Sequence, residues 1–417
     1  MTAPAIEATP EQVGLSTSGL EAVDAAVQAW IDAGVIPGAV TLVARHGKVC
    51  HVRAMGMDDI AANKPPAIDT IYRIFSMTKP VTAAAMMILW DEGLWKPEDA
   101  LEAHLPEFAD AKVFVGRDEA GAVVLEAADH PPTLLELLTH TAGLVYGTAF
   151  SDPHDPVDAG YRTAGVWDAP DLAGMMTRLG PLPLAYQPGS SWRYSIGMDV
   201  QGALIEKLSG QSLPEFMRTR LFEPLGMTDT AFHTPPEKRD RLAQLYFKGG
   251  DAPLAPIANL LSPDYEAPPA LASGGGGLVS TAGDYARFAQ MLLGRGQAYG
   301  VRVMSEAAAR LMTANHLPPV LMERGFLAGH QKIRPGFGMG FNGVVFTDPA
   351  QAGVPVGLGT YHWDGAAGTW FWIDPENELL FVGLSQHLSY SAPALQAETQ
   401  TLMAQAMLDK PEATRRP

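Results

Sequence analysis

Apolar side chains recur at helical spacing near the start of the chain and then gather in short runs. Residues 18–33 carry their apolar positions on one side and predict an amphipathic helix. The short apolar segments 39–44 and 49–54, separated by a turn-like His-Gly pair, predict two strands. Residues 76–93 are apolar on nearly every side, which is typical of a buried helix rather than a surface helix.

The rest of the chain changes character twice. Residues 94–214 combine helical patterns with long connections rich in Pro and Gly, and residues 233–272 are rich in loop-forming residues. The pattern then predicts helices near 283–293 and 305–313, strands near 337–346, 360–363, 368–373 and 379–384, and a last helix near 392–407. Helices at both ends around late antiparallel strands favour an α/β (α+β) fold, in which terminal helices cover the sheet.

The change in pattern predicts two structural lobes. Residues 1–95 and 215–417 are expected to form an α/β domain built from both chain ends, and residues 96–214 a mostly helical domain. A chain of 417 residues, of which 47% are hydrophobic, can bury a core of the size that two lobes require.

Composition disfavours several classes of partner. The net charge of −17 argues against binding to nucleic acid or to an anionic membrane, and no basic cluster offsets it. The N-terminus has no basic start followed by an apolar segment, and no apolar run is long enough to span a bilayer, so we expect a cytoplasmic protein. The single cysteine, Cys50, excludes an internal disulfide and is expected to be a small core residue.

Ser76 and Lys79 form an S-x-x-K pair at the start of the predicted buried helix. A spacing of three places the hydroxyl and the amine on one side of a helix, close enough to meet. A serine hydroxyl becomes a good nucleophile only when a base removes its proton, and a lysine can be that base where burial lowers its pKa. The first turn of a helix also has unpaired N–H groups that favour an oxyanion. This pair therefore predicts a serine hydrolase.

Other catalytic and binding motifs do not occur in the sequence. There is no G-x-S-x-G, which argues against the nucleophile elbow of α/β-hydrolases. The eleven histidines have no H-E-x-x-H or comparable spacing, so we predict no metal site, and nothing in the sequence requires a cofactor. The glycine run 274–277 lacks the G-K-[ST] of a phosphate-binding loop, so we expect a structural loop that allows close backbone approach.

Several blocks of sequence resemble the serine β-lactamase and penicillin-binding-protein-like superfamily. The resemblance is closer to the family VIII carboxylesterases, which have the class C β-lactamase fold. In chain order the blocks are residues 76–79, 137–144, 188–195, 221–227, 273–278 and 363–365. They span nearly the whole chain. The resemblance implies a β-lactamase/transpeptidase-like fold, with the active site between the sheet and the helical lobe.

The resemblance also implies roles for individual residues. Ser76 would be the nucleophile, and Tyr194, which matches the tyrosine of the second family motif, would share proton transfer with Lys79. Either of the two could be the general base, so we treat them as one coupled unit. The oxyanion hole would consist of the backbone N–H groups of Ser76 and Ala366, each worth roughly 3 kcal/mol in the transition state. Gly365 would let its strand approach the substrate closely.

Two departures from the β-lactamase pattern point to neutral substrates. Where those enzymes carry Tyr-x-Asn, this chain has Tyr-Ser-Ile at 194–196, so the side-chain amide that helps to hold a lactam is absent. Where they carry Lys-Thr-Gly, this chain has Trp-Asp-Gly at 363–365, which resembles the family VIII form and replaces a cation by a flat apolar wall. We expect Trp363, Gly365 and Ile196 to contact the substrate, together with some aromatic residues of the middle lobe.

We predict a serine carboxylesterase that hydrolyses short-chain or aryl esters through an acyl-enzyme on Ser76. Acyl transfer to alcohols and weak β-lactam opening are the expected side activities. The alternative among enzymes is an amidohydrolase, such as a β-lactamase, a D-amino-acid peptidase or an oligoamide hydrolase. The alternative among binding proteins is a non-catalytic relative that holds an acyl ligand, although such a protein would gain nothing from keeping Ser76, Lys79 and Tyr194. The expected partner is a small-molecule ester, and the sequence leaves the natural substrate and the oligomeric state open.

Overall fold

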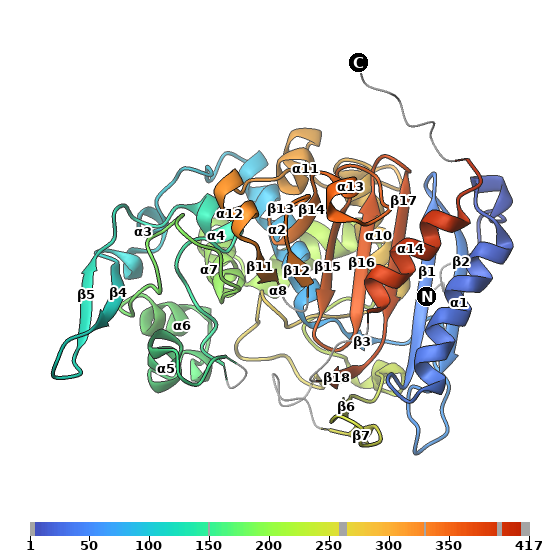
Figure 1. The fold of residues 1–417 in the computed structure, drawn as a ribbon, viewed down its shortest axis with the longest axis horizontal. Helices are drawn as coiled ribbons and strands as arrows, with labels where there is room; N and C mark the ends of the chain where they lie inside the picture. Colours follow the sequence, from blue (N-terminus) through green and yellow to red (C-terminus); the bar gives the residue numbers. More distant parts are fainter. Residues whose placement is uncertain (1–4, 149–150, 258–264, 329–330, 390–393, 410–417) are drawn as a thin grey trace.

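The computed structural model describes residues 5–148, 151–257, 265–328, 331–389 and 394–409. Among these residues the central sheet has seven strands in the order β13-β14-β15-β16-β17-β1-β2, and all neighbouring pairs are antiparallel. The strands are β1 (Gly38–Arg45), β2 (Lys48–Gly56), β13 (Phe337–Gly340), β14 (Gly343–Phe346), β15 (Tyr361–Gly365), β16 (Thr369–Asp374) and β17 (Leu379–Leu384). Strands from the start of the chain thus complete a sheet that comes mainly from its end (Figure 1).

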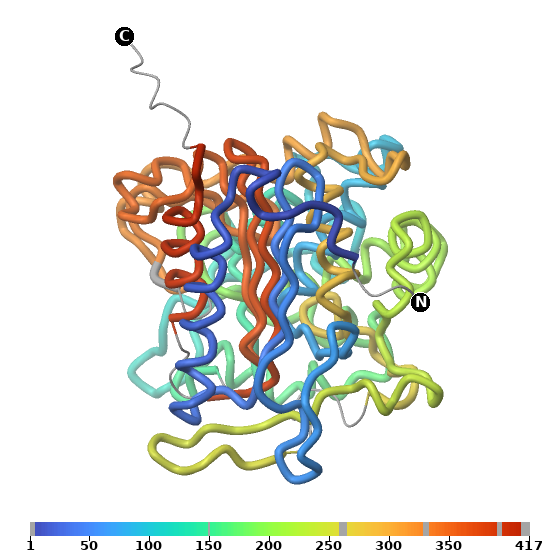
Figure 2. The backbone as a smooth tube through the Cα atoms, turned by 90° about the vertical axis from the view of Figure 1, so that its right-hand side faces the viewer, coloured from blue at the N-terminus to red at the C-terminus, as the bar shows by residue number. Residues whose placement is uncertain are grey.

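Helices cover both faces of this sheet. On one face α1 (Thr17–Asp32) and α14 (Leu395–Ala406), from opposite ends of the chain, pack side by side (Figures 1 and 2). On the other face α10 (Ala282–Leu293) packs against β1, β16 and β17, and α2 (Thr78–Asp91) belongs to the same core. The predicted arrangement of an antiparallel sheet flanked by terminal helices is therefore confirmed.

Side chains of the central strands alternate between the two faces. Leu379 and Phe381 of β17 pack with the terminal helices. Leu380 and Val382 of the same strand pack into the core that contains α10 and α2. Because successive side chains of a strand point to opposite faces, a sheet covered on both faces needs apolar residues at every position. This explains the unbroken apolar run from 379 to 384 in the sequence.

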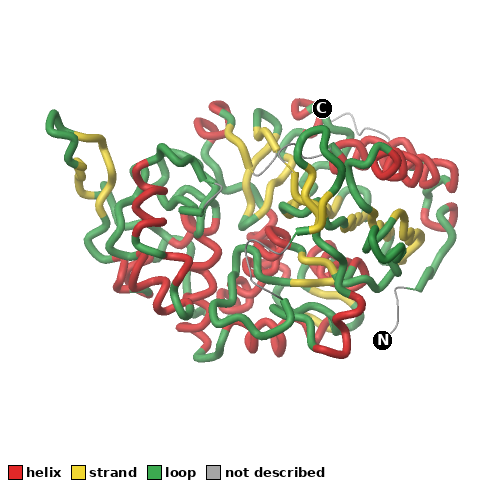
Figure 3. Tube along the Cα trace, turned by 90° about the horizontal axis from the view of Figure 1, so that it is seen from below, coloured by secondary structure: helices red, strands yellow, loops and turns green. Residues whose placement is uncertain are grey.

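A mostly helical lobe lies beside the sheet (Figures 1 and 3). It contains α3 (Leu101–His104), α4 (Leu134–Leu138), α5 (Pro156–Thr163), α6 (Leu172–Leu179), α7 (Gly197–Ser209) and α8 (Leu213–Met217), together with a projecting hairpin of β4 (Lys112–Arg117) and β5 (Val123–Ala127). Helix α7 packs against α2. This contact joins the lobe to the helix that follows Ser76.

Shorter elements connect these parts. The helical turns are η1 (Glu11–Val13), η2 (Phe75–Met77), η3 (Pro106–Phe108), η4 (Val166–Asp168), η5 (Arg218–Phe222), α9 (Glu223–Leu225), η6 (Pro236–Arg241), α11 (Glu306–Thr313), α12 (Pro319–Arg324) and α13 (Pro349–Ala352). The short strands are β3 (Tyr72–Arg73), β6 (Tyr246–Lys248), β7 (Ala255–Pro256), β8 (Val279–Ser280), β9 (Gln297–Ala298), β10 (Val301–Arg302), β11 (Phe326–Ala328), β12 (Gln331–Ile333) and β18 (His387–Ser389). The pair of β3 and β8 anchors the turn that carries Ser76.

The predicted elements of both chain ends are found close to their expected positions, with one correction there and a second in the helical lobe. Segment 337–346 is not one strand but two, because the chain turns at Asn342, whose φ is +55°. The hairpin of β4 and β5 was not predicted, because every residue of β5 is exposed and the strand shows no apolar–polar alternation. The expected start of the last helix, Ala392, lies outside the described residues. The domain boundaries at 95 and 215 stay a prediction.

Candidate active site

Ser76 lies in a strained turn that precedes α2. The residue before it, Phe75, has a φ of +42°, in the left-handed region that bulky residues avoid. Its ring is buried against Leu245 and Ala367, and this packing holds the turn in place. Residues in such backbone conformations cluster at active sites. The turn leaves Ser76 half-buried, so its hydroxyl remains accessible.

Two side chains meet at the hydroxyl of Ser76. The amine of Lys79, one helical turn further on, donates a hydrogen bond to Ser76 Oγ at 3.1 Å. The phenol of Tyr194, from the loop before α7, donates to the same oxygen at 2.7 Å. The structure thus brings together the three side chains that the sequence predicts as catalytic. Their catalytic roles stay a prediction.

Lys79 is fully buried, with an exposed fraction of 0%. Its amine also donates to the carbonyl of Gly275 at 2.5 Å and lies 3.5 Å from the hydroxyl of Tyr146. Burial lowers the pKa of Lys79 to about 7, and the negative charges of Asp199 and Asp364 partly oppose this shift. A lysine with this pKa is largely a neutral amine above neutral pH, so it can accept the proton of a serine.

Tyr194 stands in a stack of aromatic rings. Its ring is nearly parallel to that of Tyr146, with 5.4 Å between centroids, and Tyr146 stacks in turn on Trp167 at 5.6 Å. The Lys79 amine lies 4.7 Å from the centroid of the Tyr194 ring. Burial raises the pKa of Tyr194, and its hydrogen bond to Ser76 opposes that shift. The phenol is therefore protonated at neutral pH and can pass a proton between Ser76 and a leaving group.

An ion pair ties together the two loops that carry these tyrosines. Arg193, the residue before Tyr194, pairs with the buried carboxylate of Asp158 on α5. The other oxygen of Asp158 accepts a hydrogen bond at 2.6 Å from the N–H of Gly147, the residue after Tyr146. One carboxylate thus holds both loops, which keeps the two rings stacked beside Lys79.

His140 is hydrogen-bonded to the loop that carries Tyr194. Its φ is +62°, and its Nδ1 accepts a hydrogen bond from the Ser195 N–H at 3.2 Å and lies 3.0 Å from the Ser195 hydroxyl. Burial lowers the pKa of His140 well below its usual value, so the ring is neutral. A neutral imidazole that accepts a backbone hydrogen bond fixes the loop and is poorly placed to act as a general base.

The C-terminal end of β15 closely approaches the turn at Ser76. A Cβ on Gly365 would lie 2.4 Å from the carbonyl oxygen of Ile74 and 2.2 Å from Thr369 Oγ1, so only glycine fits there. Ala366 follows directly and is exposed. The glycine therefore brings the backbone of residue 366 near the serine, as an oxyanion hole requires, and the donor role of these two N–H groups stays a prediction.

Trp363 and Ile196 differ in their surroundings. The indole of Trp363 is nearly buried beside Tyr194, with 6.0 Å between ring centroids. Ile196 is a fully buried core residue before α7, and its N–H donates to the Val145 carbonyl at 3.1 Å. Trp363 is thus positioned as one wall of the site, whereas Ile196 supports the fold behind it. Substrate contact by either side chain stays a prediction.

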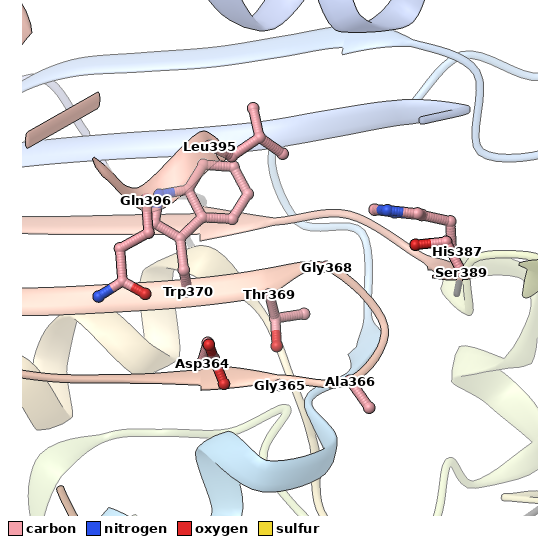
Figure 4. Close-up of a pocket in the computed structure, with 10 residues that line it drawn as sticks. All are labelled: Asp364, Gly365, Ala366, Gly368, Thr369, Trp370, His387, Ser389, Leu395 and Gln396. Carbon is pink, nitrogen blue, oxygen red and sulfur yellow. The ribbon is translucent and has the colours of Figure 1, made fainter. Parts of the chain in front are cut away.

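A pocket adjoins the edge of β15 near the start of α14 (Figure 4). Its lining residues are Asp364, Gly365, Ala366, Gly368, Thr369, Trp370, His387, Ser389, Leu395 and Gln396. Gly365 and Ala366 are the lining residues that also belong to the site, whereas Ser76, Lys79 and Tyr194 do not line this pocket. Trp370 and Leu395 of the lining pack with the terminal helices, so the pocket lies toward that face of the sheet. The lining offers polar groups as well as an aromatic ring, so the pocket suits a group of mixed polarity.

Sequence reasoning missed two residues that the fold brings to Lys79. Tyr146 was one of several unassigned aromatic residues of the middle lobe. Asp199 lies in the first turn of α7 and is fully buried. The available signal was a single acidic residue in an otherwise apolar helix start, five positions after Tyr194. A buried acid is rare unless it is paired, so that position could have been singled out.

An antiparallel sheet that carries both terminal helices on one face, joined to a helical lobe beside an S-x-x-K serine, defines a protein of the β-lactamase and penicillin-binding class. The chain belongs to the Beta-lactamase family, whose profile matches residues 23–405. The superfamily and the fold that the sequence motifs predict are therefore confirmed.

Several relatives match over nearly the whole chain. Protein Rv1367c of Mycobacterium tuberculosis (strain ATCC 25618 / H37Rv) is 37% identical over 404 residues, which are 95% of this chain and 98% of that protein. Esterase EstB of Burkholderia gladioli is 29% identical over 392 residues, 89% of this chain and 91% of that protein. The solved structure of EstCE1, described as a hydrolase with promiscuous acyltransferase activity, has a TM-score of 0.75 and 27% identity, with 94% of this chain and 99% of that chain covered.

The described part of the chain contains neither a metal-binding cluster nor a membrane-spanning helix. No group of three or more His, Cys, Asp or Glu side chains there could hold a metal ion. No helix among the same residues combines the length and the apolar character that crossing a bilayer requires. The lone thiol of Cys50 is buried, as expected for a core residue.

Proposed function

We propose that this protein is a serine carboxylesterase that hydrolyses short-chain or aryl esters through an acyl-enzyme on Ser76. The observation that carries the proposal is the pair of hydrogen bonds to Ser76 Oγ, from Lys79 at 3.1 Å and from Tyr194 at 2.7 Å. A nucleophile held by a potential base and a potential acid is what two-step acyl transfer needs. The similarity to esterase EstB supports the choice of an ester.

The reaction has two steps. Ser76 Oγ attacks the ester carbonyl carbon while its proton passes to the unit of Lys79 and Tyr194, and the oxyanion is held by the N–H groups of Ser76 and Ala366. The bond to the alkoxy oxygen then breaks, and that oxygen takes the proton from Tyr194 and leaves as an alcohol. Water, activated by the same unit, attacks the acyl-enzyme and releases the acid.

The walls of the site favour neutral esters. Trp363 places an aromatic ring beside Tyr194, where a cation would be needed to hold an anionic substrate. An alcohol in place of water would accept the acyl group, and the similarity to EstCE1, described as a hydrolase with promiscuous acyltransferase activity, supports this side activity.

The test compares hydrolysis of 4-nitrophenyl butyrate and of a chromogenic cephalosporin by the wild type and by Ser76→Ala. We expect fast ester turnover by the wild type, a loss of at least about a thousandfold in the variant, and little lactam opening. Ser190→Ala is the matched control, because this exposed hydroxyl only donates to the Gln187 carbonyl. Normal ester turnover by correctly folded Ser76→Ala would refute the proposal.

An amidohydrolase is the second candidate, and the match to the Beta-lactamase family is the observation in its favour. Efficient opening of the cephalosporin, dependent on Ser76, would support it over the esterase. An ester reaction run with added 1-butanol measures acyl transfer separately, because butyl butyrate then appears beside butyrate. No Ser76-dependent turnover of either substrate would instead favour a protein that only binds acyl ligands.

A further inference from the structure

Asp199 is a buried carboxylate that the reaction scheme above does not use. It lies in the first turn of α7, with an exposed fraction of 0%. Its Oδ1 accepts hydrogen bonds from the Ser273 hydroxyl at 2.6 Å and from the Gly275 N–H at 3.3 Å. Its Oδ2 has no hydrogen-bond partner among the described residues. An orphaned carboxylate oxygen in a protein interior is costly, so its position calls for an explanation.

The orphaned oxygen faces the catalytic amine across a glycine. A Cβ on Gly275 would lie 2.8 Å from Asp199 Oδ2, 3.4 Å from the Tyr146 hydroxyl and 3.5 Å from Lys79 Nζ. Three polar atoms from three separate segments therefore surround the place where any other residue would carry a side chain. The glycine keeps this space clear, so the charge of the carboxylate acts on the amine through space.

The same carboxylate also fixes the backbone that holds the lysine. Gly275 donates its N–H to Asp199 Oδ1 and accepts a hydrogen bond from Lys79 at its carbonyl, at 2.5 Å. A Cβ on the preceding residue, Gly274, would lie 2.4 Å from the Met198 carbonyl oxygen, which shows how tightly this turn packs on the start of α7. Asp199 thus influences Lys79 in two ways. Its hydrogen bond to Gly275 fixes the backbone that binds the amine, and its charge acts on the amine through space.

We propose that Asp199 is a positioning residue of the active site that supplies the buried negative charge opposite Lys79 and so stabilises the ammonium form that Lys79 takes during acyl transfer. This inference rests on the proposed function of Ser76 and Lys79. When Ser76 Oγ bonds to the acyl carbon, its proton moves to the amine, and a positive charge arises in a place without water. When the alkoxy oxygen leaves, it takes a proton through Tyr194 and the amine becomes neutral again. Asp199 exchanges no proton in this scheme, and the hydrogen bonds that its Oδ1 accepts favour the ionised form that the scheme needs.

Hydrogen bonding and charge around Asp199 agree with this role. The donors at Oδ1 favour the ionised carboxylate, although burial raises the pKa of Asp199 overall. Lys79 on α2 lowers that pKa, and Asp199 in turn raises the pKa of Lys79. The other titratable groups near the pair are Tyr146, Tyr194, His140 and Asp364. The two tyrosines and the histidine are neutral at working pH, so Asp364 on β15 is the other charge to consider.

The test is the pH dependence of Ser76 labelling by an aryl fluorophosphonate, followed by mass spectrometry of the intact protein. In the wild type the labelling rate should rise with pH as Lys79 loses its proton, with a midpoint near its pKa of about 7. Asp199→Asn removes the charge but keeps the shape, so the lysine holds its proton less tightly. We expect the midpoint to move to lower pH by about one to three units. The plateau rate should fall roughly tenfold, because a weaker base remains.

Two further variants separate charge from architecture. Ser273→Ala removes the hydroxyl that favours the ionised carboxylate, so we expect a smaller shift of the midpoint in the same direction, and this variant decides the question if Asp199→Asn does not fold. Asp284→Asn is the matched control. The carboxylate of Asp284 is also buried, on α10, but it accepts hydrogen bonds from the Asp229 N–H and the Thr230 hydroxyl. The midpoint of the labelling rate against pH should therefore not move in this variant. Slower labelling with an unmoved midpoint in both site variants would show that Asp199 only holds the turn, and would overturn the proposal.

Failure of the underlying function looks different. If wild-type Ser76 is neither labelled nor turns over esters, the esterase proposal fails before Asp199 is tested. If the wild type is labelled with a normal pH dependence and Asp199→Asn leaves the midpoint in place, the esterase proposal stands and the role of Asp199 falls. A shifted midpoint in Asp199→Asn, together with an unshifted one in Asp284→Asn, supports both.

Discussion

The two sides of Ser76 are built differently. On one side Lys79 is fully buried and hydrogen-bonded to Gly275, and stacked aromatic rings exclude water from it. On the other side β15 ends at Gly365, and the exposed Ala366 follows. We call these the closed side and the open side. The closed side can set the pKa of a base, because burial penalises its charged form, whereas the open side can admit an ester.

This contrast explains why the two sides depend on different properties of their residues. The closed side depends on side-chain charge and desolvation, so a substitution that removes the charge but keeps the volume of the side chain would disturb it. The open side depends on the position of the backbone, so a substitution that adds an uncharged group and displaces the strand would disturb it. Substitutions of these two kinds should therefore affect the two sides unequally, and the predictions below use that difference.

The largest expected effect comes from Lys79→Met on the closed side. Methionine fills a similar volume but cannot accept a proton, so kcat for 4-nitrophenyl butyrate should fall by about a hundredfold to ten-thousandfold. The thermal midpoint should stay the same or rise, because an amine no longer has to be buried. Steady-state kinetics and calorimetry measure the two quantities.

The control for this variant is Lys207→Met. That lysine is exposed in the last turn of α7 and has no part in the site, so both kinetics and stability should stay close to the wild type. A fall in kcat of less than about tenfold in Lys79→Met would mean that Tyr194 acts as the base without the lysine. The closed side would then be a structural support rather than the source of the base.

A smaller effect is expected from Gly365→Ala on the open side. The new Cβ would meet the Ile74 carbonyl oxygen at 2.4 Å, so the strand must move away from the turn at Ser76. If this removes the Ala366 N–H from the oxyanion, the loss is roughly 3 kcal/mol, or about a hundredfold in kcat, with little change in KM.

Gly160→Ala is the matched control for that glycine. It lies within α5, nothing lies within 4 Å of the added Cβ, and alanine favours a helix, so activity should be unchanged and stability equal or higher. If Gly365→Ala also keeps full activity, the N–H of residue 366 is not an oxyanion donor. The predicted oxyanion hole would then have to be assigned elsewhere.

The sequence predicts the parts of the site that belong to short motifs, and misses those that only tertiary structure creates. Ser76 and Lys79 are three residues apart, so their proximity follows from helix geometry. The contact between Asp199 and Gly275 joins segments 76 residues apart. Gly275 belongs to the glycine run that the sequence singles out, but nothing in the sequence pairs this run with Asp199. The turn within 337–346 was also missed, although its Asn342-Gly343 pair is a typical hairpin signal between apolar runs.

The smallest expected effect concerns Trp363, which stands between the two sides. It lies beside Tyr194 of the closed side and two residues before Gly365 of the open side. If its ring is a wall for the substrate, Trp363→Ala should raise KM for an aryl ester by roughly fivefold, the equivalent of about 1 kcal/mol of aromatic contact, and leave kcat nearly unchanged. Trp363→Phe keeps an aromatic wall and should recover most of the lost affinity.

The split between the two kinetic constants decides to which side Trp363 belongs. A lower kcat at unchanged KM would mean that the indole acts on Tyr194, since a ring that only binds substrate stabilises ground state and transition state alike. Comparing an aryl ester with an alkyl ester of the same acid sharpens the result. Loss of affinity confined to the aryl ester places Trp363 on the open side as a specificity residue, whereas an equal fall in kcat for both places it on the closed side with the tyrosine.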